Sequence, residues 1–173
     1  LGWSRASLAA RTCSLGWSLL RPNVNWHMAV QADKQALTAF LREEGSKIPN
    51  FPVFTADSFK EDHFPGIEDF IMIKDRNNEI IACAALWNQQ NYKQYTVFSY
   101  SPLFSLLRPL SKWIFPLFNL PPLPPTGTQL NFFTASFYLV KDKNPKIFRT
   151  LLQVIKHVGR NYDYFLIASP ESS

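Results

Sequence analysis

The stretch FFTASFYLVKDKNPKIFRTLLQVIKHVG, residues 132–159, decides the fold class of this chain. An apolar run ends at Val140, a basic turn follows, and helical periodicity extends from Asn144 to the glycine at position 159. Asn144 is a good N-cap, and Pro145 suits the first helical position, where a missing N–H costs little. Gly159 is a natural helix stop. The stretch therefore predicts a strand, a charged turn and an amphipathic helix.

Neighbouring segments extend this unit into a sheet. The run YDYFLIAS (162–169) predicts a further strand, which completes a β-α-β unit with two parallel strands. Upstream, DFIMIKDRNNEIIACAALW (69–87) predicts an antiparallel hairpin with a polar turn at DRNN. Residues 31–47 predict an amphipathic helix that ends at Gly45. These elements indicate an α+β (or α/β) class, a mixed sheet with flanking helices.

The segment between the hairpin and the third strand is unusual in composition. Residues 103–118 are strongly apolar, but Arg108, Lys112 and two prolines interrupt the run. A buried or partner-facing helix pair is therefore expected there rather than a membrane span. The following PPLPP, residues 121–125, predicts a stiff connector.

Composition limits the classes of function. The chain has 173 residues, 46% of them hydrophobic and 15% aromatic, which indicates either one globular domain or one such domain with an appendage. Only 18% are charged, so some apolar surface is expected to meet another domain or subunit, and a homo-oligomer stays open. The net charge of +5 fits either a mildly basic protein or one that attracts a phosphorylated cofactor. The sequence contains no arginine-rich run, so nucleic-acid binding is not expected.

Cysteine and histidine placement points to a reducing compartment and to no metal centre. Cys13 and Cys83 are far apart and form no disulfide framework, so a cytoplasmic location is expected. His27, His63 and His157 share no metal-ligand spacing.

The amino-terminal residues read as a separate piece. LGWSRASLAARTCSLGWSLL, residues 1–20, is too polar to span a bilayer and has no clear signal-peptide cleavage site. Residues 1–26 are interpreted as the end of an upstream domain or a linker helix. Residues 27–173 are then the main domain, incomplete at its carboxyl end.

The basic turn raises the question of a bound anion. A helix N-terminus carries free N–H groups and a partial positive charge, which favour phosphate or carboxylate. Lys141, Lys143 and Lys146 surround that end of the helix. The pattern fits a pyrophosphate-binding turn, and it also fits a capped helix with a solvated basic turn.

The order of elements resembles the Gcn5-related N-acetyltransferase (GNAT) family. The segments PVFTADSF, ALWNQQNYKQ, SPLFSLLRPL and LPPTG resemble the C-terminal domain of bacterial proteins with two such domains in tandem, over roughly residues 30–169. The resemblance implies a GNAT-like sheet in which the parallel strands splay apart and hold acetyl-CoA. It also implies an acyl-CoA-dependent N-acetyltransferase that acts on a small-molecule or peptide amine, with an upstream domain in the same chain.

Site residues are carried over from this resemblance. Those implied to bind acetyl-CoA are Leu139, Val140, Lys141, Lys143, Asn144 and Lys146. The family motif, Q/R-x-x-G-x-G/A, relies on glycines, but the matching KDKNPKIF has none, and Pro145 lacks an N–H. A catalytically degenerate domain with a structural, partner-binding or ligand-binding role therefore stays an alternative.

The sequence gives only weak signals for catalytic residues. Tyr92 lies in the polar segment 88–94, where the family's acceptor-substrate loops begin, and Glu171 is the one carboxylate after the last predicted strand. These two are the catalytic candidates. Tyr162 and Tyr164 are expected to be packing residues.

Overall fold

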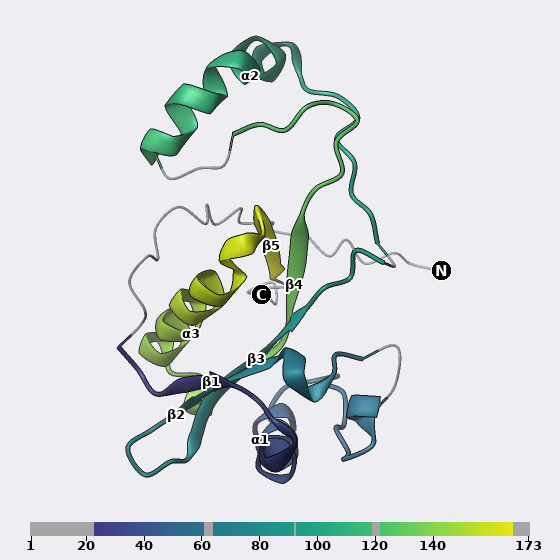
Figure 1. Cartoon of the computed structure of the whole chain (residues 1–173). Coiled ribbons are helices and arrows are strands. Elements are labelled where there is room, and N and C mark those ends of the chain that lie inside the picture. The colour runs from purple at the N-terminus through teal and green to yellow at the C-terminus, as the bar shows by residue number, and fades with distance from the viewer. Residues whose placement is uncertain (1–22, 61–63, 92, 119–121, 168–173) are drawn as a thin grey trace.

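The computed structural model describes residues 23–60, 64–91, 93–118 and 122–167. These residues form five strands, three α-helices and several short 3-10 turns around a single mixed sheet (Figure 1). The strands are β1 (Trp26–Met28), β2 (Phe70–Lys74), β3 (Ile80–Trp87), β4 (Phe132–Val140) and β5 (Tyr164–Ile167). The helices are α1 (Lys34–Gly45), α2 (Pro102–Ile114) and α3 (Pro145–Val158).

The strands lie in the sheet in chain order, β1-β2-β3-β4-β5. Neighbours are antiparallel except β4 and β5, which are parallel and joined by α3. The predicted hairpin and the predicted β-α-β unit are thus both present, and the mixed α/β class is confirmed. At the hairpin turn, Asn78 has the positive φ that tight turns require (65°), whereas Asn77 does not.

The first strand has no counterpart among the predicted elements. β1 is only three residues long and pairs with β2 through Trp26↔Ile73 and Met28↔Ile71. Trp26 is the last residue of the segment that the sequence analysis set apart, so the sheet begins at that residue among the described ones. Three residues are too few to show a periodic pattern, and their strand conformation depends on pairing with β2.

Each face of the sheet is covered by one helix. On one face, Leu37, Phe40 and Leu41 of α1 pack against Phe70 and Met72 of β2 and a group of phenylalanines around Phe54. On the other face, Leu151, Val154 and Ile155 of α3 pack against Ile71 and Ile73 of β2 and Ala82 and Ala84 of β3. Alternate residues of β2 therefore serve the two cores, as the strand period requires.

Capping residues and glycines predicted from the sequence lie at the ends of α1 and α3. Asn144 Oδ1 accepts a hydrogen bond from the N–H of Lys146 at 2.9 Å, which is the expected N-cap contact for α3. Gly159 follows the last residue of α3, and Gly45 is the last residue of α1. α1 begins later than predicted, because Gln31–Asp33 form a 3-10 turn.

Residues 96–129 form a projection from the body of the molecule, here called the arm (Figure 1). Its two ends meet, since the N–H of Leu130 donates to the Tyr95 carbonyl at 2.8 Å and Thr96 bridges Gln129. The arm carries one α-helix, α2, and a 3-10 turn at Phe115–Phe118, instead of the expected helix pair. α2 is not buried, because most of its large apolar side chains are exposed to solvent. None of the helices in the described ranges has the length and apolarity needed to cross a bilayer.

Candidate functional site

A groove of about 720 Å³ lies beside the carboxyl end of β4. Four strand residues line it: Tyr138 and Val140 from the α3 side of the sheet, and Phe137 and Leu139 from the α1 side. Because side chains of both faces contribute, the groove runs along an edge of β4. β3 occupies one edge of β4, so the groove lies on the edge that borders β5.

Among the described residues, the parallel pairing ends before the stretch of β4 that lines the groove. β4 pairs with β5 from Phe132↔Tyr164 to Ala135↔Ile167. Ile167 is the last described residue of β5, and the stretch of β4 that lines the groove begins two residues after Ala135. The backbone edge of β4 therefore borders the groove from Phe137 onward.

A β-bulge in β4 changes which side chains face the groove. Cys83 pairs with Leu139 but Ala85 pairs with Ser136, so Ala84 lies opposite two residues, Phe137 and Tyr138. Phe137 has a φ of 49°, a left-handed conformation that is strained for a residue with a bulky side chain. Without the extra residue, Phe137 would share a face with Ala135, against α3. The bulge instead turns Phe137 toward α1 and Phe54, at 5.1 Å between ring centroids.

Other walls of the groove come from segments far apart in the chain. They are Glu44 at the end of α1, Lys47, Ile48, Pro49 and Phe51 in the loop that follows, Lys143 in the turn after β4, and Phe148 in α3. The Phe148 ring is half-buried and packs 5.7 Å from the Tyr138 ring. It forms a side wall and leaves the groove open.

Two lysines mark the end of the groove nearest the turn. Lys143 lines the groove and has an exposed side chain. Lys47 donates to the buried Glu44 carboxylate at 2.7 Å, and this hydrogen bond raises the pKa of Lys47. Asp142 adds to that pKa shift, which shows that Lys47 lies near the turn. The groove is thus apolar along β4, and its end near the turn has the exposed Lys143 beside the Lys47–Glu44 ion pair.

The turn itself is strained and largely satisfied by its own groups. Asp142 and Lys143 have φ values of 54° and 51°, which residues other than glycine rarely adopt. The N–H of Asn144 donates to the Lys141 carbonyl at 3.3 Å, and the Asn144 side chain takes up the N–H of Lys146. Pro145 has no N–H. The helix N-terminus therefore offers few backbone donors, and side-chain cations must supply most of the attraction for an anion.

Of the residues predicted to bind the cofactor, some line the groove and others do not. Leu139, Val140 and Lys143 line the groove. Lys141 instead donates to Glu79 of the hairpin at 3.1 Å, and that contact raises the pKa of Lys141. Asn144 is occupied as the N-cap, and Lys146 is exposed outside the groove lining.

The catalytic candidates Tyr92 and Glu171 lie outside the described residues. Gln89 and Gln90, which lie close to Tyr92 in the sequence, form hydrogen bonds to β4 and to the residue before it. Gln90 Nε2 donates to Asn131 Oδ1 and to the Phe132 carbonyl, and Thr134 Oγ1 donates to the buried Gln89 at 3.3 Å. As expected, Tyr162 packs against the Phe133 ring, at 5.0 Å, and burial raises the pKa of Tyr164. Neither tyrosine lines the groove.

Sequence reasoning missed the contribution of α1. Glu44 lies one turn after Phe40, on the buried side of α1, so helical spacing was a usable signal for Glu44. Phe51 carried no comparable signal. Gly45 allows Phe51 to pack closely, because a Cβ at position 45 would meet the Phe51 ring.

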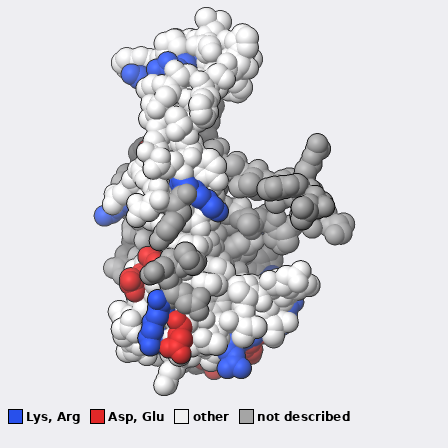
Figure 2. Space-filling view, turned by 90° about the vertical axis from the view of Figure 1, so that its right-hand side faces the viewer, with Lys and Arg blue, Asp and Glu red and all other residues white. Residues whose placement is uncertain are grey.

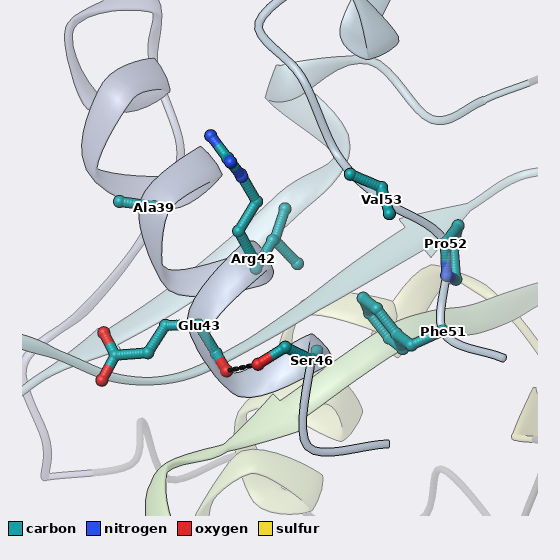
Figure 3. Close-up of a pocket in the computed structure, with 9 residues that line it drawn as sticks. Ala39, Arg42, Glu43, Ser46, Phe51, Pro52 and Val53 are labelled. Atoms are coloured by element: carbon teal, nitrogen blue, oxygen red, sulfur yellow. Dashed lines mark hydrogen bonds between the residues drawn. The ribbon is translucent and has the colours of Figure 1, made fainter. Parts of the chain in front are cut away.

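A second hollow, of about 500 Å³, also has Phe51 in its lining (Figure 3). It is lined by the last turns of α1 and by Phe51, Pro52 and Val53. Figure 3 shows that the Arg42 and Glu43 side chains point away from each other, and that Ser46 Oγ is used in a hydrogen bond to the Glu43 carbonyl. Its polar groups do not converge, so this hollow is a weaker candidate than the groove.

The Cys83 thiol is poorly placed to act as a nucleophile. Cys83 is fully buried in β3 opposite Leu139, and burial raises the pKa of its thiol to about 12. The thiolate, which is the nucleophilic form, is therefore scarce at neutral pH.

Comparison with known proteins does not assign the chain to a family. Neither the models of known protein families nor the curated proteins gave a match to this sequence.

Proposed function

We propose that this domain binds a phosphorylated acyl-thioester carrier, with acetyl-CoA as the first candidate, and transfers its acyl group to an amine. The observation that carries the proposal is the groove along the β5 side of β4, which is apolar along the strand and has at one end the exposed cation Lys143 beside the Lys47–Glu44 ion pair. An elongated ligand with an apolar portion and an anionic end matches that distribution. The volume of about 720 Å³ lies within the usual range for small-molecule sites.

The groups present suit such a ligand in a particular way. Lys143 would pair with phosphate through its side chain, since Asn144 and Pro145 leave few backbone donors at the helix end. Phe137, Leu139 and Val140 would contact the apolar part of the ligand. The resemblance to the GNAT family supports the same placement, although the turn lacks the glycines of the family motif.

The reaction needs no covalent intermediate on the protein. A thioester supplies an acyl group to an amine, with a new C–N bond replacing the C–S bond and the amine proton passing to a base or water. The residues of this chain would hold the two partners in line and exclude water from the apolar part of the groove. Bulged backbone near Phe137 is the candidate donor for polarising a carbonyl, because a bulge frees backbone groups from regular pairing.

A binding role without catalysis is the second candidate. Among the described residues that line the groove, Glu44 is the one carboxylate, and it is held by Lys47 at 2.7 Å. A domain that binds the carrier but lacks a base would share the groove and the lysines. The two candidates differ only in turnover.

Calorimetry with the full chain tests the proposal. Acetyl-CoA should bind saturably, and Lys143→Glu should weaken its affinity at least about tenfold by placing a negative charge beside phosphate. Lys93→Glu is the matched control, because Lys93 is exposed and is not among the residues lining the groove. Its affinity should match that of the unaltered chain. Absence of saturable binding to a folded protein would refute the proposal.

Turnover separates the two candidates once binding is established. Release of free CoA thiol is measured with a panel of small amines and amino-terminal peptides. Thiol release that requires both acetyl-CoA and an amine identifies the transferase. Tight binding with no amine-dependent release identifies the binding domain.

A further inference from the structure

The arm exposes an amphipathic helix whose apolar face has no partner in the described residues. Leu103, Leu106, Leu110 and Trp113 recur at helical spacing along α2. Leu106 is 72% exposed and Trp113 is 79% exposed, and Leu117 just beyond α2 is 80% exposed. Side chains of this size and in this pattern are normally buried.

The arm has its own internal contacts, so this exposure is a property of an organised segment. Ser111 is fully buried, donates to the Arg108 carbonyl at 2.6 Å and accepts the N–H of Leu123 at 3.1 Å. The Tyr100 hydroxyl donates to the Pro124 carbonyl at 2.7 Å. These bonds hold the returning chain against one side of α2 and leave the leucine and tryptophan stripe outward. Figure 1 shows α2 at the far end of the arm, away from the sheet.

Charge on and around the arm has a single sign. Residues 80–141 contain no aspartate or glutamate, and the cations of the arm are Arg108 and Lys112. In α2 these two follow each other at a spacing of one helical turn, on the side opposite Leu106 and Trp113. In Figure 2 the projecting part of the surface shows Lys and Arg but no acidic side chains among its described atoms.

We propose that the arm docks on an anionic lipid bilayer, with α2 lying in the plane of the interface. A helix with Leu and Trp on one face and Arg and Lys on the other is suited to the boundary between headgroups and acyl chains. Tryptophan favours that boundary, and anionic headgroups attract the two cations. α2 has 13 residues, about 20 Å at 1.5 Å per residue, which suits surface binding and is too short to span the hydrocarbon core.

The charge argues for lipid over a second copy of the chain. Two arms packed against each other would bring together cations with no carboxylate on either arm to offset them. An anionic bilayer satisfies both the apolar stripe and the cations at once.

Vesicle flotation with the full chain tests this inference. The chain should float with vesicles of phosphatidylcholine and phosphatidylglycerol at roughly 3:1, bind less to phosphatidylcholine alone, and release in high salt. Leu106→Asp with Trp113→Asp should lower the partition coefficient at least about tenfold, because charged side chains replace buried apolar surface. Both positions are exposed, so the fold should survive. Ala39→Asp with Val53→Asp adds the same charge at exposed sites on the body and should leave partitioning unchanged.

Other results would overturn the inference. Flotation of the Leu106/Trp113 double variant as efficiently as the unaltered chain would show that α2 is not the contact. Equal binding to both kinds of vesicle at all salt concentrations would remove the role of anionic lipid. Failure of the chain to float, together with a dimer by light scattering that the double variant abolishes, would identify a second copy as the occupant.

Discussion

At the scale of single residues, Asp33 joins three elements of the fold. Its carboxylate accepts the Val30 N–H at 3.1 Å and lies 3.2 Å from Lys74 Nζ of β2 and 3.3 Å from His27 Nε2 of β1. Burial tends to raise the pKa of Asp33, but the hydrogen bonds and the neighbouring cation outweigh it and lower the pKa. The folded state therefore favours the ionised carboxylate.

This shift predicts a pH-dependent effect of Asp33→Asn. A carboxylate with a lowered folded-state pKa stabilises the protein above its unfolded pKa, and the stabilisation is lost as pH falls through the folded pKa. At neutral pH the variant should lose about 1 kcal/mol of unfolding free energy. Urea unfolding across the acid range measures the difference, which should shrink toward low pH. Asp57→Asn serves as control, because Asp57 also forms an ion pair but is exposed. A loss of stability in Asp33→Asn that does not depend on pH would contradict the ionic role of Asp33.

At the scale of elements, β4 joins the two cores and borders the groove. Phe133 stacks on Phe165 of β5 at 5.6 Å and meets Tyr162 edge-on at 5.0 Å, so its ring is held from two sides. Gly159, at the end of α3, lies against the same ring, and a Cβ there would meet it. The closeness of α3 to β4 thus depends on a residue without a side chain.

Gly159→Ala should destabilise the protein by about 1–3 kcal/mol, because the Phe133 ring has little room to move. The sign is informative: φ at Gly159 is −76°, so backbone conformation alone would favour alanine. Gly66→Ala is the control, since its Cβ would meet only the flexible end of the exposed Glu68 side chain. Chemical denaturation compares the two variants. A stabilising Gly159→Ala would mean that α3 can shift away from β4 at little cost.

At the scale of the whole molecule, the body and the arm have different roles. Both cores are formed by the sheet with α1 and α3, and neither includes a residue of α2. The arm leaves and returns at adjacent positions, where the N–H of Val97 donates to the Thr128 carbonyl at 3.1 Å. The groove belongs to the body and the lipid-binding surface to the arm, so the two proposals can fail independently.

Excision of residues 98–127 tests this division. An Asn-Gly pair joining Val97 to Thr128 should close a tight antiparallel turn, because these two residues are already paired. The unfolding free energy should change by less than about 1 kcal/mol, since the excised apolar side chains are mostly exposed. Thermal unfolding measures stability, and flotation should show loss of vesicle binding. A chain that no longer folds would show that the arm contributes to the core.

The sequence by itself determined the elements whose signals are local. Two apolar runs around a polar turn identify β2 and β3, the helical stripe and Asn144 identify α3, and Gly45 and Gly159 mark helix ends. These features depend on neighbours within a few residues along the chain, which is why they can be predicted without a structure.

Only the tertiary structure decided where the groove lies and what lines it. The bulge at Phe137 depends on how β4 pairs with β3, and it reverses the faces that simple alternation assigns to Phe137 and Leu139. Lys141 pairs with Glu79 of the hairpin while Lys143 reaches the groove, although both belong to one basic turn. Glu44, Lys47 and Phe51 precede Phe137 by 86 residues or more in the chain. Contacts between distant segments follow from how the layers pack, and no pattern of nearby residues encodes them.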